Sequence, residues 1–170
     1  MTQMGVTNLK SNLTNPARVY LWEVLIPNPI GGGDYETLML RAQSASQPER
    51  SVGAINIPFK QSAGVVYPGK LTYPHTWDVT FVEGEDRAVF DAFYAWAQKV
   101  VHDKDNVSTG EIKTNIYLNL INTKGEIDKR VKLIGCYPQA VGAVVLDYGA
   151  EGQVALPITF AYDSWEEVST

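Results

Sequence analysis

Histidine and cysteine, which often serve as metal ligands and in nucleophilic catalysis, are scarce in this sequence. The 170 residues include two histidines, His75 and His102, and a single cysteine, Cys136. The spacing of these residues matches no zinc-binding pattern. Cys136 could act as a nucleophile only if folding brought a histidine beside it, and a buried, unreactive thiol is the favoured interpretation. The sequence therefore predicts neither a metal centre nor a nucleophilic active site.

Two segments look superficially like ligand-binding loops. The consecutive glycines at 31–33 are not followed by Lys and Ser or Thr, as a phosphate-binding loop requires. In DKDNVSTGE, residues 103–111, Asp103 and Asp105 could be calcium ligands, but Val107 occupies the position of a third ligand. A solvated loop is the better prediction there. We expect no cofactor, no metal and no enzymatic activity, since the residues of an esterase or a protease are not assembled.

The composition is that of one folded domain. Hydrophobic residues make up 45% of the chain and charged residues 19%, and 170 residues suffice for one sizeable core. We predict a polar N-terminal arm at 1–17, either free or docked on a neighbouring subunit, and a single domain at 18–170. The single cysteine allows no disulfide within the chain. A net charge of −5 gives no sign of the basic surface with which proteins hold DNA.

The start of the chain and its hydropathy pattern bear on localisation. The first residues lack the basic stretch followed by an apolar stretch that marks a secretion signal. No run approaches the roughly 18 apolar residues of a membrane-spanning helix. We therefore expect folding in a cytosol-like compartment and no membrane span.

Strand patterns dominate the chain. The clearest lies at 76–81, where Trp77, Val79 and Phe81 alternate with polar residues at the period of a half-buried strand. Comparable or weaker apolar patterns predict further strands at 19–26, 35–44, 115–120, 131–134, 143–148 and 154–163.

One amphipathic helix is predicted at 86–101. Val89, Phe93, Trp96 and Val100 recur there at helical spacing and form an apolar stripe suited to packing on a sheet. Acidic residues precede the helix, where the helix dipole favours negative charge. The predicted fold class is therefore mainly β, an antiparallel β-sandwich or partly open barrel with one flanking amphipathic helix.

Residues 50–70 place apolar side chains among small ones, which predicts a hairpin or extended loop that buries little of itself. Charge is also unevenly distributed around this segment. Between Thr37 and His75 the only acidic residue is Glu49, whereas the basic residues are Arg41, Arg50, Lys60 and Lys70. Because the rest of the chain is strongly acidic, copies could associate head to tail, positive surface against negative.

Five stretches of the sequence, taken in their order and spacing, carry a resemblance to a known family. They are NPARVYLWEVLI, LRAQSASQPERSVGAINIPF, WDVTFVEGEDRAVFDAFYAWAQ, LIGCYPQAVGAVVLDY and VALPITFAYDSWE. The most specific part is a turn at 135–138, then the motif at 146–148, Leu-Asp-Tyr, then a strand ending at 162–166. From about Pro16 to Glu166 the chain resembles the major tail tube proteins of contractile-tailed bacteriophages.

The resemblance implies a small β-sandwich or barrel with a flanking helix, assembled as six-membered rings that stack into a tube. Inner strands of neighbouring subunits would join into a continuous β-barrel around a channel, closing edges that an isolated subunit leaves unpaired. The poorly buried segment then becomes a contact between subunits or rings, and the arm at 1–17 could bridge neighbours. The expected contact residues are Arg50, Val52, Ile55, Ile57, Phe59, Lys60, Val65, Val66, Tyr67 and Lys70.

The resemblance also implies a structural protein of the virion tail, assembled in the cytoplasm of the host bacterium. The expected partners are further copies in a homo-hexamer and in stacked rings, the tail sheath, a baseplate or tube initiator, a tail terminator, and a tape measure protein inside the lumen. Double-stranded DNA would pass through without specific binding, which the acidic lumen of the family favours. Lys60 and Lys70 depart from that pattern, and we expect them to face subunit interfaces or carboxylates of a neighbour.

Two other functions remain open from the sequence. The tube of a genome-free contractile injection system, such as a tailocin or a type VI-like machine, would share the fold and differ in cargo, and the neighbouring genes would distinguish it. A β-sandwich carbohydrate-binding module could use exposed Tyr67, Tyr73 and Trp77. However, Trp77 alternates with Val79 and Phe81, which favours a place in the core.

Overall fold

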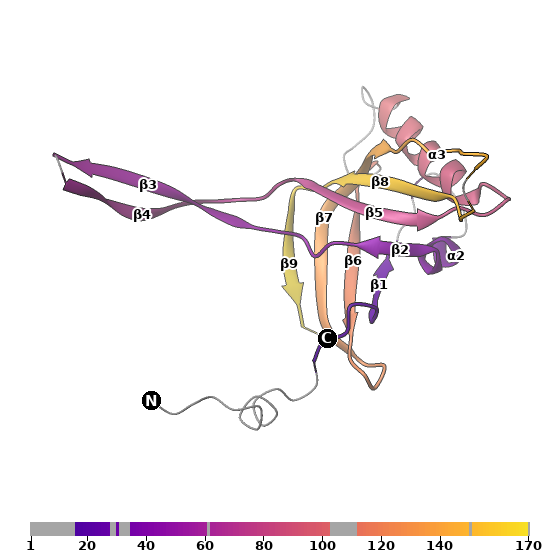
Figure 1. The fold of residues 1–170 in the computed structure, drawn as a ribbon, viewed down its shortest axis with the longest axis horizontal. Helices are drawn as coiled ribbons and strands as arrows, with labels where there is room; N and C mark the ends of the chain where they lie inside the picture. Colours follow the sequence, from indigo (N-terminus) through magenta and orange to yellow (C-terminus); the bar gives the residue numbers. More distant parts are fainter. Residues whose placement is uncertain are drawn as a thin grey trace.

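The computed structural model describes the chain over residues 16–27, 30, 35–60, 62–102, 112–149 and 151–169. Its elements, in chain order, are β1 (Trp22–Leu25), α2 (Tyr35–Leu40), β2 (Ala42–Ala45), β3 (Ser51–Phe59), β4 (Ser62–Thr72), β5 (Thr76–Val82), α3 (Ala88–His102), β6 (Thr114–Ile121), β7 (Ile127–Val141), β8 (Ala155–Ala161) and β9 (Ser164–Val168). Figure 1 shows a compact body from which the β3–β4 hairpin projects. The predicted fold class is confirmed: the protein is mainly antiparallel β with one prominent helix, and its sheet does not close into a barrel.

The body is built on one strongly bent antiparallel sheet. In the described residues the strand order is β1-β6-β7-β8-β5-β2, with β9 also paired to β7. The long strand β7 joins the two halves, because residues 130–134 lie between β6 and β9 whereas 137–141 pair with β8. Gly135 lies at the change of partner with φ +70°, and a side chain there would collide with the Asp163 carboxylate. Glycine thus permits the bend that divides the sheet.

The hydrophobic core lies between the bent sheet and α3. Trp77 of β5 and Phe160 of β8 are opposite each other in register, and their ring centroids are 5.9 Å apart. Phe93 and Trp96 of α3 meet the same phenylalanine at 5.6 Å and 6.2 Å. All four side chains are at most 2% exposed. The predicted alternation of β5 and β8 and the predicted helical stripe are therefore confirmed as the two faces of one core.

The start of α3 is fixed by a buried carboxylate. Glu83 is only 7% exposed, and its two carboxylate oxygens accept hydrogen bonds from the amides of Val89 and Phe90 at 3.3 Å and 2.9 Å. These amides belong to the first turn and have no partner within the helix. Beside this turn, Asp86 pairs with Arg41 at 2.9 Å and so connects α3 to the chain between α2 and β2.

The strand predicted at 35–44 is wrong over its first part. Leu38 is 3% exposed and Leu40 is 87% exposed, although alternate residues of a strand would lie on the same face. The residues YETLML include the good helix formers Glu, Leu and Met and form α2, and only 42–45 extend as β2. An apolar pattern over only six residues fits the period of a strand and that of a helix, so it could not distinguish a short helix from a strand.

The strand predicted at 143–148 is also wrong. Pairing of β7 with β8 ends at Val141 and Ile158, and the Gly142 amide makes the last hydrogen bond, to the Pro157 carbonyl at 2.8 Å. Beyond that point no strand in the described part of the chain runs alongside, so the apolar run becomes an exposed loop. The strand predicted at 19–26 begins later, because 19–20 form a turn before β1.

Several sequence-based predictions fall on residues that the structure does not describe. These are the arm up to residue 15, the glycine run at 31–33 and the loop at 103–111. Among the helices that the structure does describe, none combines the length and the apolar character needed to cross a lipid bilayer.

Candidate assembly interface

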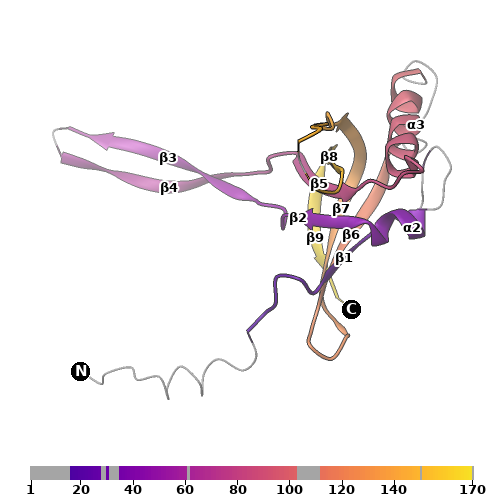
Figure 2. The same ribbon diagram turned by 45° about the vertical axis from the view of Figure 1, so that its right-hand side comes forward.

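The β3–β4 hairpin is the most prominent surface of the molecule. Within the described residues its two strands pair only with each other, and Figures 1 and 2 both show them extending away from the body. The register places Ile55 opposite Tyr67 and Ile57 opposite Val65. An isolated two-stranded hairpin is marginally stable in water, and its outer edges present unpaired backbone groups. The hairpin therefore has the properties of an element that is completed by a partner.

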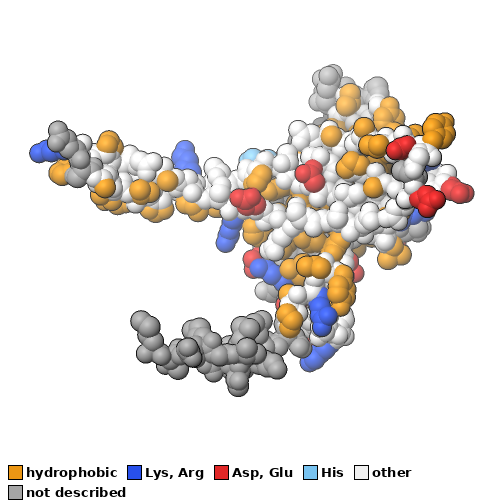
Figure 3. Space-filling view, viewed as in Figure 1, with side chains coloured by type: hydrophobic (Ala, Val, Ile, Leu, Met, Phe, Trp, Pro, Cys, Tyr) orange, Lys and Arg blue, Asp and Glu red, His pale blue; other side chains and the backbone are white. Residues whose placement is uncertain are grey.

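One face of the hairpin is continuously apolar. Directly opposed residues of an antiparallel pair point to the same side, so Ile55, Ile57, Val65 and Tyr67 share a face. Their side chains are 51–53% exposed, although they are large and hydrophobic. Figure 3 shows hydrophobic side chains along the length of the hairpin. We call these four residues the hairpin face; its contiguous apolar surface makes it a candidate for contact with another molecule.

The other predicted contact residues lie around the hairpin face. Val52 and Val66 are 60% and 64% exposed. Val66 belongs to the opposite side of the ribbon, since it pairs with Asn56, whereas Val52 pairs with Leu71 beyond an irregularity of the register. Phe59 is 60% exposed near the tip, where Lys60 takes a positive φ of 44° and holds its ammonium 5.8 Å from the Phe59 ring. Lys70 is exposed further down β4. Among the described residues neither lysine forms an ion pair within its own chain.

Arg50 occupies a different place from the rest of the predicted set. It lies at the base of the hairpin, with its guanidinium carbon 5.3 Å from the centroid of the Trp165 ring. The same tryptophan donates its indole N–H to the Glu49 carbonyl at 3.1 Å. The hydroxyls of Ser51 and Thr72 are 2.9 Å apart and close the first rung of the ribbon. Arg50 thus helps to attach the hairpin to β9, whereas the other predicted residues are presented to solvent.

Sequence reasoning did not identify the open edges of the sheet, of which β1 and β9 form two and β2 a third in the described residues. Strands β6 and β9 pair with the same residues of β7, at 131–133, and so flank it on opposite sides. The four strands therefore run in the order β1-β6-β7-β9, and in the described residues β1 and β9 have no strand on their outer sides. Register cannot be read from a single strand, so these edges became visible only in the fold.

The outward face of these four strands carries paired charges. Asn119 donates to the Glu23 carboxylate at 2.7 Å and accepts from the Arg130 Nε at 2.8 Å, which links β1, β6 and β7. One rung away, the Lys132 ammonium lies 3.1 Å from Glu166 of β9. Each cation on this face is thus bound to an acceptor of the same chain. The only sequence signal was the alternation of polar residues with Ile116 and Leu118 along β6.

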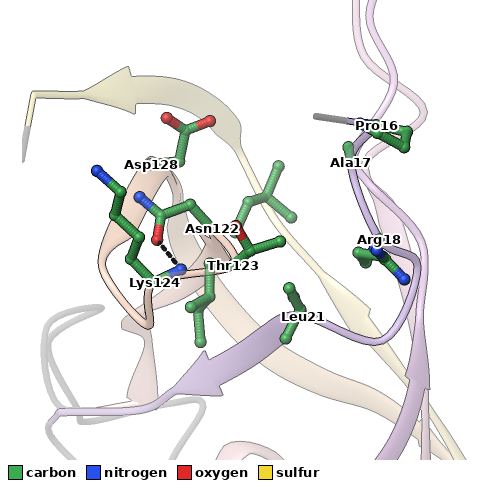
Figure 4. Close-up of a pocket in the computed structure, with 10 residues that line it drawn as sticks. Pro16, Ala17, Arg18, Leu21, Asn122, Thr123, Lys124 and Asp128 are labelled. Carbon is green, nitrogen blue, oxygen red and sulfur yellow. Dashed lines mark hydrogen bonds between the residues drawn. The ribbon is translucent and has the colours of Figure 1, made fainter. Parts of the chain in front are cut away.

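A hollow of about 440 Å³ lies at the other end of β7, beside the β6–β7 turn. Figure 4 shows Arg18 and Leu21 from the N-terminal segment on one side of it, and the turn residues 122–124 with Asp128 on the other. The Asn122 side chain accepts from the Lys124 amide at 2.9 Å and thereby serves to close the turn. The described residues contain no group of three side chains suited to hold a metal ion.

The residues considered for chemistry occupy structural positions. Cys136 is 0% exposed, so its predicted burial is confirmed, and this burial raises the pKa of its thiol from 9.0 to about 12. His75 lies with its Nδ1 3.0 Å from the Tyr162 carbonyl and links β5 to the end of β8. The side chain of His102 lies outside the described part of the structure.

Comparison with solved structures identifies the fold. The sheath/tube terminator of the extracellular contractile injection system PVC has a TM-score of 0.67 at 15% identity, with 92% of this chain and 99% of that chain covered. A chain of the sheath–tube complex of the same system has a TM-score of 0.61 at 17% identity, covering 95% and 98%. A chain of the tube-terminating cap of the anti-feeding prophage has a TM-score of 0.64 at 16% identity, covering 92% and 93%. Identities this low show a shared fold.

Sequence comparison identifies the family. None of the curated proteins compared with the chain is similar enough to count as a match. The family described as phage tail tube protein matches residues 12–168, which is nearly the whole chain. That family implies a structural rather than enzymatic role and a place in the virion tail, as the sequence resemblance also indicated. The protein is therefore a member of the phage tail tube protein family.

Proposed function

We propose that the protein is the repeating subunit of a phage tail tube. In this proposal six copies form a ring, rings stack into a rigid tube, and the tube penetrates the host envelope and conducts DNA during genome ejection. Assembly takes place in the cytoplasm of the host bacterium, before the tail is incorporated into the virion. Family membership and the shared fold support this function, and the open edges of the sheet are the observation that carries it.

The two open edges are suited to joining copies head to tail. Every neighbouring pair in the order β1-β6-β7-β9 is antiparallel, so β1 and β9 run in opposite directions. The β9 strand of one copy can therefore add to the β1 strand of the next as another antiparallel neighbour. Repetition around a closed ring covers the β1 and β9 edges, which an isolated subunit leaves open to aggregation.

The outward face of the same four strands would line the channel. The opposite face of the sheet is covered by the core and α3, so ring closure through β1 and β9 leaves the polar face toward the lumen. Arg130 and Lys132 are engaged by acceptors of their own chain, which limits their contact with DNA phosphates. Lys60 and Lys70, which form no ion pair among the described residues, lie on the hairpin instead, and we propose that they meet carboxylates of a neighbouring copy.

The remaining partners follow from the machine to which such a tube belongs. We propose the tail sheath around the tube, a baseplate or initiator at one end, a terminator at the other, and a tape measure protein in the lumen. Chains with this fold occur in a sheath–tube complex, in tube-terminating structures and in a baseplate of contractile injection systems. These relatives support the sheath, the baseplate and the terminator as neighbours of this chain.

The same relatives favour a second candidate function, in a genome-free contractile injection system. The PVC system and the anti-feeding prophage supply the similar structures described above. The two functions differ in the contents of the particle. Particles purified with this protein should contain packaged DNA if it serves a phage, and none if it serves an injection system. A copy number of six per particle would identify it as a terminator, whereas a tube subunit is present in many rings.

Electron microscopy of the concentrated, purified protein tests the proposed function. Six-fold rings or tubes with a central channel are expected, either directly or after a baseplate preparation is added as a template. Rings of another symmetry, or monomers that persist with the template, would contradict the proposal.

Two matched proline variants test the role of the β9 edge. Successive amides of an edge strand point alternately toward its partner and away from it, so Glu166→Pro and Glu167→Pro remove amides of opposite direction. The variant that loses the outward amide should remain folded and fail to form rings. The other should be less stable as a monomer. If Glu166→Pro and Glu167→Pro both fold and both still form rings, β9 is not the edge that joins the copies.

A further inference from the structure

The Leu-Asp-Tyr motif at 146–148, one piece of the most specific part of the sequence, is presented to solvent in the single chain. Leu146 and Tyr148 are 74% and 112% exposed, and the adjacent Val145 is 88% exposed. The loop that carries them leaves the sheet after Gly142, and the Asp147 carboxylate accepts from the Gly149 amide at 2.9 Å. The turn is therefore formed locally while three large apolar side chains point away from the core. Such a cluster on a loop indicates a contact with another molecule.

Acidic residues surround this cluster. The Glu83 amide donates to the Val154 carbonyl at 2.9 Å, which holds the β7–β8 loop next to the turn between β5 and α3. Glu85, Asp147 and Glu151 are exposed there, and none of them forms an ion pair among the described residues. We define the residues at 83–87, 142–149 and 151–154 as the acidic end, which contains five acidic residues and one basic residue, Arg87.

The hairpin and the acidic end lie on opposite sides of the body. The hairpin leads into β5 at Thr76, and the same strand leaves at Val82 into the acidic end. Residues 50–70 contain three basic residues and no acidic one. Figure 3 shows acidic side chains gathered at the end of the body remote from the hairpin, which itself carries basic ones. The two surfaces thus lie on opposite sides of the body and carry opposite charges. Each of them also exposes large apolar side chains.

We propose that the β3–β4 hairpin of one copy docks on the acidic end of the next copy. The hairpin face covers Val145, Leu146 and Tyr148, while Lys60 and Lys70 lie beside the surrounding carboxylates. Because the two surfaces differ and lie on opposite sides, the contact is heterologous and repeats from copy to copy. This inference rests on the proposed function and specifies which surface receives the hairpin.

The direction of this contact agrees with ring closure through β1 and β9. In Figure 1 the hairpin extends beyond β9, whereas the acidic end lies on the side of the body that carries β1 and α2. A copy whose β1 adds to β9 therefore brings its acidic end to the side on which the hairpin projects. The same head-to-tail arrangement accounts for both contacts.

The hollow beside the β6–β7 turn is a less suitable receptor for the hairpin. Arg18 and Lys124 line it together with a single carboxylate, that of Asp128. The lysines of the hairpin would meet like charges there, which opposes docking. It therefore serves as the alternative receptor in the test.

Disulfide cross-linking between two different variants tests the docking. Ile57→Cys and Leu146→Cys are prepared separately, mixed under assembly conditions and oxidised. A cross-linked dimer is expected from the mixture and not from either variant alone. Ile57→Cys mixed with Thr123→Cys, at the alternative receptor, should give none. The native Cys136 does not interfere because it is 0% exposed. All three substituted side chains are partly or fully exposed, so folding is retained.

Charge reversal supplies a second measurement. Lys60→Glu with Lys70→Glu should lower the yield of cross-linked dimer about tenfold, and adding Glu85→Lys with Asp147→Lys to the partner should restore it. The docking would be overturned if Ile57→Cys and Leu146→Cys gave no dimer, or if Ile57→Cys gave a dimer only with Thr123→Cys. Electron microscopy of the same samples separates the two proposals. Rings without the cross-link refute the docking alone, and absence of rings even with a baseplate preparation as template refutes the proposed function as well.

Discussion

Trp165 of β9 donates its indole N–H to the main-chain carbonyl of Glu49, 3.1 Å away, at the point where the hairpin leaves the body. Its ring also lies 5.3 Å from the guanidinium carbon of Arg50, and the side chain is 8% exposed. One residue of an open sheet edge therefore holds the base of the projecting hairpin. These contacts join the two surfaces that we propose for assembly, so a change at the edge strand is expected to alter the direction of the hairpin.

Replacement of Trp165 by Phe tests this connection. The variant keeps an aromatic ring and loses one hydrogen bond, so the free energy of unfolding should fall by about 1 kcal/mol, as measured by urea denaturation. Tube formation should fall further than this loss explains, because the hairpin is no longer held. Trp96→Phe is the control, since it removes a similar bond to the Ile112 carbonyl at 3.0 Å far from the hairpin. Equal tube yields from the two variants would rule out the connection.

Glu83 is expected to determine the stability of α3. It accepts from the amides of Val89 and Phe90 while being 7% exposed, so Glu83→Ala leaves buried donors without a partner. The free energy of unfolding should fall by about 1–2 kcal/mol. Glu85→Ala, at an exposed neighbouring carboxylate, should change it by less than about 0.5 kcal/mol. Circular dichroism during urea unfolding measures both, and equal effects would contradict the capping role.

The core could be predicted from the sequence because its signal is local. Trp77, Val79 and Phe81 alternate along one strand, and all three are at most 2% exposed in the fold. The stripe of Phe93 and Trp96 likewise needs only the helical period to be recognised, and it meets the sheet as expected. Periodicity is a property of a single element, so it survives whatever the element packs against.

The candidate interface could be predicted only in part, because it depends on pairing between distant segments. The exposure of the hairpin followed from its weak apolar pattern, but its attachment to Trp165, over a hundred positions away, did not. The loop at 143–148 has the composition of a strand and lacks a partner strand, which no local pattern can show. The open edges of β1 and β9 are likewise a property of the strand order. A local pattern identifies which face of a strand or helix is buried, whereas the open edges of a sheet follow from the order in which its strands pair.

Phe160 and Phe59 should separate folding from assembly when each is replaced by Ala. Phe160 is 0% exposed and contacts the rings of Trp77, Phe93 and Trp96, so its loss should cost about 3–5 kcal/mol of unfolding free energy. Phe59 is 60% exposed on the hairpin, and its loss should change stability by less than about 0.5 kcal/mol while reducing tube yield. Denaturation curves and electron microscopy provide the two readouts. A Phe59→Ala variant that assembles normally would argue against a hairpin contact at this residue.

The ion pair between Arg41 and Asp86 predicts a pH dependence in acid. The guanidinium donates to both carboxylate oxygens, at 2.9 Å and 3.0 Å, and mainly this hydrogen bonding lowers the Asp86 pKa from 3.8 to about 2. Above the higher value the carboxylate is charged in both states, and its stabilising contribution is complete. As the pH falls toward about 2, the unfolded state takes up the proton first, so the contribution shrinks and is then lost.

The difference in unfolding free energy between wild type and Asp86→Asn should therefore decrease across this window. Urea denaturation at several pH values measures it, and Glu85→Gln, whose carboxylate forms no ion pair among the described residues, should show no such trend. A difference that stays constant down to pH 2 would mean that the pair does not stabilise the folded state.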